Sequence, residues 1–164
     1  MGGIAAIKVL FLTLSLDRGG AERQLVILAK VLHKRGHEVS VAVFNPNGPF
    51  EKDLKESGIP VINLNMFRRW EIIYSIVHLI KVLRFQKPDI LHGYLGGPNI
   101  LTILLKVVLP SHTRIVWGVR ASKMNLSQYT LIDRLTYYLE RMLSGFSDHI
   151  IVNSYSGLEY ASQK

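Results

Sequence analysis

Apolar and polar residues follow two different periods at the beginning of this chain. A nearly continuous apolar run covers residues 7–16, and it is followed by Gly19 and Gly20 and then by leucines at helical spacing up to Gly36. The continuous run predicts a buried strand, and the helical spacing predicts a helix that ends near Gly36. The chain is therefore expected to begin with a strand, a glycine-containing turn and a helix.

The same alternation continues along the rest of the sequence. Further apolar or β-branched runs predict strands at 38–44, 60–64, 89–92, 114–119 and 148–152. Between them, helices are predicted at 50–57, 70–86, 100–109 and 131–143. A second glycine loop is expected at 93–99, with Pro98 suited to open the helix that follows. In the helix at 70–86, one face is expected to carry the apolar residues Ile72, Ile73, Ile76, Val77, Ile80 and Leu83.

Strands that alternate with helices predict a single α/β domain. We expect a doubly wound, Rossmann-like parallel sheet between two helical layers, a three-layer α/β/α architecture. The strand order 3-2-1-4-5-6 would bring the turn after the first strand next to the turn after the fourth, where such sheets bind ligands. Both turns contain glycine, which lets a phosphate or a sugar approach the backbone. A ligand site is therefore expected at this edge.

Familiar nucleotide and signalling motifs are missing from these turns. The sequence around Gly19 does not have the spacing G-x-G-x-x-G, and the second strand ends without an acidic residue. The phosphate loop G-x-x-x-x-G-K-[ST] is absent as well. A response regulator is disfavoured because the third strand ends in Leu64 and Asn65. A non-catalytic, ligand-binding Rossmann-like module remains an alternative to an enzyme.

Composition adds bounds on partners and compartment. The chain has 164 residues, 48% of them hydrophobic, and a formal net charge of +8, which favours an anionic partner. It has no cysteine, which excludes disulfides and thiolate metal ligands. We find no signal peptide and no apolar run long enough to span a membrane, so a cytoplasmic protein is expected. Residues 1–3 are expected to be an addition from cloning.

Segments in sequence order resemble the N-terminal half of a family 4 glycosyltransferase of the GT-B fold. They are KVLFLTLSLDRGGAER, HKRGHEVSVAVF, KPDILHGYLGG, IVWGVRAS and DHIIVNSYSG. The resemblance implies that residues 1–164 form the acceptor-binding domain, while a nucleotide-sugar domain absent from this chain holds the donor. It further implies sugar transfer with retention, without metal or cofactor, to a glycan, lipid-linked or cell-envelope acceptor. The chain alone is expected to be inactive.

The resemblance also implies roles in the first loop and at the fourth strand. Gly19 and Gly20 would approach the donor phosphates and the acceptor, with Glu22 and Arg23 lining the loop. For Glu22 the alternative is a first-turn carboxylate favoured by the helix dipole, and for Arg23 it is a solvated charge. His92 is expected to face the cleft as a catalytic residue, although a lone histidine is more often packed or solvated.

Further candidate residues follow these. Tyr94, Gly96, Gly97 and Asn99 would bind the acceptor, with loop packing or helix capping as the alternative for Tyr94 and Asn99. Arg120 stands where many members of the family have a histidine. An arginine is always protonated, so it can stabilise a leaving phosphate but cannot act as a base. Asn153 and Ser154 match the Asn-Ser that ends the last strand in the family, and Ser154 is equally suited to cap a helix.

The segment Phe67–Lys87 combines cations with aromatic and aliphatic residues. The stretch between Asn65 and Lys87 contains one anion, Glu71, and five cations, which are Arg68, Arg69, Lys81, Arg84 and Lys87. A basic amphipathic helix of this kind can lie on an anionic membrane, here the inner face of the cell membrane. The alternative is an ordinary helix whose apolar face is core and whose charges are solvated. Nucleic-acid binding is disfavoured because no recognised motif supports it.

Overall fold

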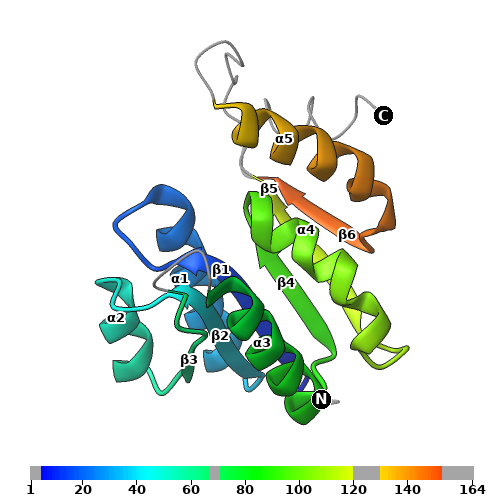
Figure 1. Ribbon diagram of the computed structural model, residues 1–164. Helices are drawn as coiled ribbons and strands as arrows, with labels where there is room; N and C mark the ends of the chain where they lie inside the picture. The colour runs from blue at the N-terminus through cyan, green and yellow to red at the C-terminus, as the bar shows by residue number, and fades with distance from the viewer. Residues whose placement is uncertain (1–4, 67–70, 120–129, 153–164) are drawn as a thin grey trace.

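The fold is a parallel sheet between two helical layers, as the sequence predicts. A computed structural model describes residues 5–66, 71–119 and 130–152. Its sheet has the order β3-β2-β1-β4-β5-β6, with all neighbours parallel. The strands are β1 (Lys8–Ser15), β2 (Glu38–Asn45), β3 (Val61–Asn63), β4 (Ile90–Tyr94), β5 (Arg114–Val119) and β6 (His149–Val152). The doubly wound order is thereby confirmed (Figure 1).

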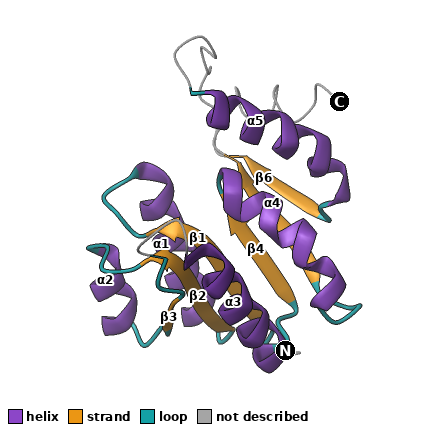
Figure 2. Ribbon diagram, in the orientation of Figure 1, coloured by secondary structure: helices purple, strands orange, loops and turns teal. Residues whose placement is uncertain are grey.

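Helices cover both faces of the sheet (Figure 2). One layer contains α1 (Gly20–Lys34) and α2 (Phe50–Glu56), and the other contains α3 (Ile72–Gln86), α4 (Gly96–Leu104) and α5 (Leu131–Leu143). Two short 3₁₀ helices follow α4 and α5, namely η2 (Leu105–Val108) and η4 (Ser144–Phe146). No helix in the described ranges has the length and apolar character that crossing a membrane requires.

The central strand β1 contributes side chains to the core on both faces of the sheet. Phe11 packs with the α1 residue Leu25 on one face, and Leu10 packs with the α3 residue Leu79 on the other. All of these side chains are fully buried. This explains the continuous apolar run in the sequence, because a strand covered on both faces has no solvent side. A third cluster, centred on Trp117, joins β5 to α4 and α5.

The second glycine segment is not the loop that the sequence predicts. β4 continues through Gly93 to Tyr94, two residues beyond the predicted end, and α4 begins at Gly96. Gly93 stays in the strand because α4 packs tightly on it. A Cβ at Gly93 would lie 2.7 Å from Asn99 Oδ1 and 2.9 Å from the Asn99 Cα. Only Leu95 separates the strand from the helix.

Helix α3 buries only part of the face that its apolar residues predict. The buried side chains are Ser75, Leu79 and Leu83. Ile73 and Val77 are exposed instead, at 72% and 45%. The hydroxyl of Ser75 is buried without a hydrogen-bond partner. The predicted apolar face is therefore only partly in the core, and much of it meets solvent.

Candidate functional site

The carboxyl ends of β1 and β4 lie side by side at one edge of the sheet. Leu12 pairs with Gly93 and Thr13 pairs with Tyr94, so the two strands reach this edge together. Each is followed by a helix whose first residue is glycine, Gly20 in α1 and Gly96 in α4. A helix begins with free backbone N–H groups and a partial positive charge. The predicted meeting of two glycine-bearing turns therefore occurs, although the second turn is shorter than expected.

The loop after β1 ends in an N-terminal helix cap without a capping side chain. Gly19 is the N-cap of α1, and its backbone N–H donates to the Asp17 carbonyl at 2.8 Å. The carboxylate of Glu22 folds back onto the Gly19 backbone, into the space that a Cβ of Gly19 would take. Gly20 and Arg23 are exposed. Glu22 thus takes the first-turn position that the helix dipole favours, directly in front of the N-terminus.

The loop after β2 supports this first loop from the side. A Cβ at Gly48 would lie 2.5 Å from the Leu16 carbonyl carbon and oxygen, so only glycine fits there. The Phe50 N–H donates to the Leu16 carbonyl at 3.1 Å. The buried carboxylate of Glu51 accepts the Asn47 N–H at 2.6 Å and so closes the loop. The sequence predicts a turn here but not its contact with the first loop. Glycine occurs in most turns, so its presence does not reveal such a contact.

His92 lies inside the sheet rather than at its edge. Its side chain is only 4% exposed, and its ring packs between Phe11, at 5.0 Å between ring centroids, and Tyr94, at 5.4 Å. Burial lowers the pKa of His92 to about 4, so its imidazole is neutral near neutral pH. Its Nε2 has no hydrogen-bond partner. The His92 side chain is thus buried within the fold, and its catalytic role at a cleft stays a prediction.

Tyr94 and Asn99 are buried as well. Tyr94 is 5% exposed, and its ring covers Gly118, where a Cβ would lie 2.9 Å from Tyr94 Cδ2. Asn99 is fully buried, and its Nδ2 donates to the Gly118 carbonyl at 3.2 Å and to Glu140 Oε1 at 2.6 Å. Both side chains therefore pack and bond within the protein, which is the alternative given for them from the sequence. Gly97, by contrast, is exposed, and a Cβ there would meet nothing within 4 Å.

Glu140 has a carboxylate next to the start of α4, and the sequence analysis did not identify it. It lies in α5, half-buried, and accepts hydrogen bonds from Asn99 and from the Gly96 backbone N–H. Burial raises its pKa, and the two hydrogen bonds act in the opposite direction. Its partners are about forty residues away in the chain, so no local pattern could have revealed it.

Some of the predicted site residues lie outside the described part of the chain, namely Arg120, Asn153 and Ser154. The same holds for residues 67–70 of the basic segment. The described part of β5 ends at Val119, which precedes Arg120 in the chain. β5 pairs with β4 through Gly118 and Tyr94, so the described sheet leads to this same edge.

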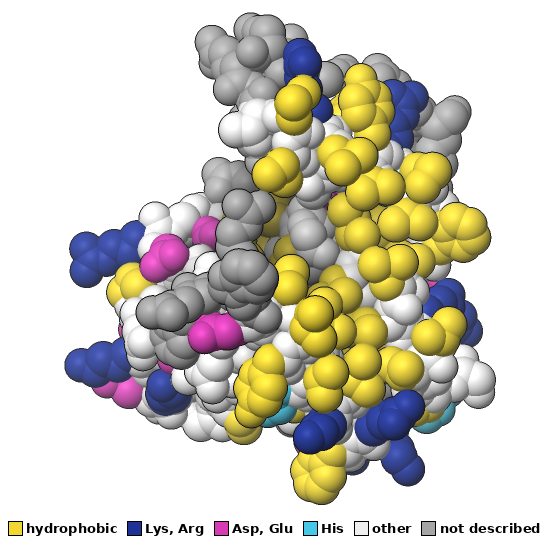
Figure 3. Space-filling model, in the orientation of Figure 1, with side chains coloured by type: hydrophobic (Ala, Val, Ile, Leu, Met, Phe, Trp, Pro, Cys, Tyr) yellow, Lys and Arg dark blue, Asp and Glu magenta, His cyan; other side chains and the backbone are white. Residues whose placement is uncertain are grey.

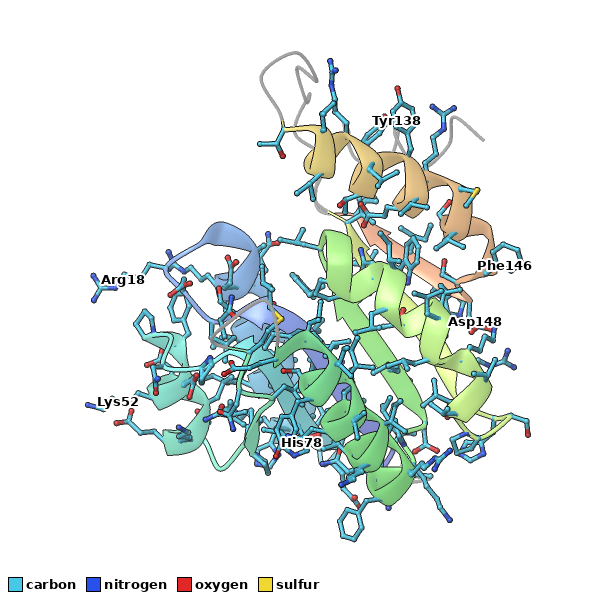
Figure 4. All side chains as sticks on the ribbon, viewed as in Figure 1. Arg18, Lys52, His78, Tyr138, Phe146 and Asp148 are labelled. Carbon is cyan, nitrogen blue, oxygen red and sulfur yellow. The ribbon has the colours of Figure 1, made fainter. Side chains whose placement is uncertain are left out.

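One outer face of the molecule is rich in exposed apolar side chains (Figure 3). They come from α3, the end of α4 with η2, α5 and η4. They include Ile73, Tyr74, Val77, Phe85, Leu104, Val107, Leu131, Leu135, Tyr138, Met142 and Phe146. Figure 4 shows Tyr138 and Phe146 directed outward, away from the sheet. On α3 the exposed cations Lys81 and Arg84 lie among the apolar residues. The lower part of this face therefore combines apolar area with positive charge.

Comparison with known proteins places the chain in a family. The profile of Glycosyltransferase Family 4 matches residues 18–163. A Campylobacter jejuni enzyme is 34% identical over 110 residues, which are 63% of this chain and 30% of the relative. It is named as an α-1,4-N-acetyl-D-galactosaminyltransferase acting on a GalNAc-containing glycan carried on PP-undecaprenol.

Solved structures share the fold over part of their length. Anabaena HepE in complex with UDP and glucose matches with a TM-score of 0.71 and 19% identity, over 96% of this chain and 41% of HepE. MurG from Acinetobacter baumannii matches with a TM-score of 0.58 and 16% identity, over 91% of this chain and 42% of MurG. The chain therefore spans less than half the length of these relatives. With the profile match over most of its residues, the chain belongs to glycosyltransferase family 4.

Proposed function

We propose that the full-length protein is a retaining glycosyltransferase and that this chain is its acceptor-binding half. The observation that carries the proposal is the edge where β1 and β4 end side by side, each followed by a helix that begins with glycine. The nucleotide-sugar donor is held mainly by the part of the protein outside this chain. Transfer needs no metal, and the chain alone transfers no sugar.

In the proposed reaction, the acceptor hydroxyl attacks the anomeric carbon on the face that the leaving group departs from. The new carbon–oxygen bond forms as the bond to the donor phosphate oxygen breaks, and a phosphate oxygen takes the hydroxyl proton. The backbone at Gly19 and Gly20, at the α1 N-terminus, stabilises the charge on the leaving diphosphate, together with Arg120. Glu22 and Arg23 line this loop.

The acceptor occupies the neighbouring α4 side of the edge in this proposal. Gly96 and Gly97 bring the backbone close to it, and Asn153 and Ser154 contribute from the end of β6. Tyr94 and Asn99 pack beneath this side of the edge, and the His92 ring packs against Tyr94. An undecaprenol-linked glycan is the proposed class of acceptor, because the Campylobacter relative is named for such a substrate.

A donor and acceptor assay on the full-length protein tests this function. UDP-N-acetylgalactosamine and UDP-glucose are offered with undecaprenyl-diphosphate-linked N-acetylgalactosamine, and the anomeric configuration of the product is read by NMR. We expect transfer with retention, and we expect Gly20→Val to abolish it while the protein still folds. The matched control is Gly145→Val, because Gly145 is exposed like Gly20 and lies in η4, where a Cβ would meet nothing within 4 Å. Inversion of configuration, or full activity of Gly20→Val, contradicts the proposal.

The same proposal includes peripheral contact with the inner face of an anionic membrane through the segment 67–87. In its described part, Ile73, Tyr74 and Phe85 are exposed at 72%, 65% and 89%. They surround the exposed cations Lys81 and Arg84, which suits a surface of anionic lipid headgroups. A helix that only covered the sheet would not need this apolar area on its outer side.

Vesicle co-sedimentation separates the membrane contact from the enzyme function. We expect the full-length protein to bind vesicles that contain phosphatidylglycerol and to dissociate as salt rises, because the charges are screened. The double variant Ile73→Ser and Phe85→Ser should lose most of this binding. The control pair Leu135→Ser and Met142→Ser changes exposed apolar residues of α5 instead. Equal binding to neutral vesicles, or equal losses in both variants, would refute a contact through this segment.

A further inference from the structure

The turn between β4 and α4 is held in a conformation that its sequence does not favour. Leu95 has φ 66° and ψ 140°, and Gly96 has φ 39°. Positive φ is uncommon for a leucine because its Cβ crowds the backbone. A residue in such a region keeps its conformation only when the surrounding structure fixes it. The turn therefore needs an anchor outside itself.

The first anchor is the carbonyl of Gly118 at the end of β5. It accepts the Leu95 backbone N–H at 3.1 Å and the Asn99 Nδ2 at 3.2 Å. The first donor belongs to the turn residue Leu95, and the second to Asn99 in the first turn of α4. One carbonyl group thus ties the beginning and the end of the β4–α4 connection to the neighbouring strand.

The second anchor is Glu140, which reaches the turn from α5. Its carboxylate accepts the Asn99 Nδ2 at 2.6 Å and the Gly96 backbone N–H. Asn99 uses its Nδ2 for two acceptors, Gly118 and Glu140, and an amide nitrogen has two hydrogens to give. A reversed amide would place an oxygen against both acceptors, so these partners fix the Asn99 orientation.

Packing by α5 reinforces the contact. Thr136 lies one helical turn before Glu140, and its Cγ2 would be 3.5 Å from a Cβ of Gly96. Glu140 therefore holds Gly96 through a hydrogen bond, and Thr136 limits the space beside the same glycine. Loss of the carboxylate would leave the Gly96 N–H and one Asn99 hydrogen without their acceptor in a largely buried place, which favours a rearranged turn.

We infer that Glu140 is a positioning residue for acceptor binding, acting with Asn99 through the 95–97 turn. By holding Gly96 from inside, it leaves Gly97 as the exposed glycine that presents its backbone to an incoming hydroxyl-bearing acceptor. Glu140 does not touch the acceptor itself. The inference rests on the proposed function, because it assigns the α4 side of the edge to the acceptor.

Kinetics of the full-length enzyme test the inference with UDP-N-acetylgalactosamine and undecaprenyl-diphosphate-linked N-acetylgalactosamine as probes. For Glu140→Gln we expect the acceptor KM to rise about tenfold or more, since small displacements of positioning groups cost up to about a hundredfold. The donor KM should stay close to the wild-type value. Glu140→Asp, which keeps the charge, should recover part of the loss. Glu56→Gln is the matched control, because Glu56 is exposed on α2.

Hydrogen exchange of the full-length protein gives a readout that needs no substrate. In Glu140→Gln, the peptide that covers residues 93–99 should exchange faster, while peptides from α1 and β2 should not change. Unchanged exchange in this peptide overturns the inference even when the wild type shows no transfer. Parallel losses in the donor and acceptor constants overturn it too, because they indicate general damage to the fold. Absence of transfer by the wild type with these probes counts against the proposed function instead.

Discussion

Acidification should weaken the fold through one histidine, His92. Its pKa in the folded protein is about 4 rather than the ordinary 6.5, because burial between Phe11 and Tyr94 disfavours the imidazolium. The unfolded chain therefore binds this proton first as the pH falls. Stability is unaffected above pH 6.5, falls between pH 6.5 and about 4, and is not reduced further below that by this group. The linked loss is about 2 kcal/mol at pH 5 and about 3 kcal/mol at the acid limit.

Urea denaturation of the wild type and of His92→Gln, at a series of pH values from 7.5 downward, measures this effect. The variant should be less stable at neutral pH, because a buried amide replaces a packed ring. Between pH 7 and 5, however, its free energy of unfolding should fall by about 2 kcal/mol less than that of the wild type. His112→Gln is the control, since His112 is a 60% exposed histidine near Asp89. If the wild type and His92→Gln respond equally to pH, His92 is not the buried neutral group described here.

Other substitutions test the packing around the same edge. Gly93→Ala should lower the free energy of unfolding by about 1–3 kcal/mol, because its Cβ would meet backbone and side-chain atoms of α4. Gly97→Ala, where the space is open, should leave thermal denaturation within about 2 °C of the wild type; similar midpoints for the two variants would contradict this packing. Thr102→Val should cost about 1–3 kcal/mol, because it leaves the buried Trp117 Nε1–H, now 2.9 Å from the Thr102 hydroxyl, without an acceptor. The Ile115 backbone N–H in β5 lowers the pKa of Asp148 below its ordinary 3.8. In an acid titration the wild type should therefore lose stability below pH 3.8, and Asp148→Asn should not show this loss. Identical acid transitions would exclude this contribution.

The sheet could be predicted from the sequence because each strand is a local apolar run. The run at 7–16 lacks a polar side, and this placed β1 at the centre, where both faces are covered. Alternation of strands and helices then left few ways to wind the chain, and the observed order is the expected one. Local pattern thus identified the elements, and general rules of parallel sheets placed the edge where two of them end.

The details of the candidate site depend on contacts that local pattern does not encode. A glycine is typical of a loop, yet Gly93 lies in β4, where α4 leaves no room for a Cβ, and the preceding His92 is buried. In α3 apolar residues occur around most of the helix, so periodicity could not tell which side meets the sheet. The buried side includes Ser75, a residue that hydrophobicity alone would place outside.

The two helix N-termini at the edge differ in a way that bears on the proposed division of labour. Each has a carboxylate from the protein near its positive end, Glu22 at α1 and Glu140 at α4. Glu22 is carried by the same helix and lies over Gly19, which has no side chain, so a side-chain rotation would let an anionic diphosphate replace it. Glu140 is fixed by two donors and cannot leave without exposing them. The α1 end can therefore receive an anion, whereas the α4 end, already neutralised, suits a neutral sugar hydroxyl.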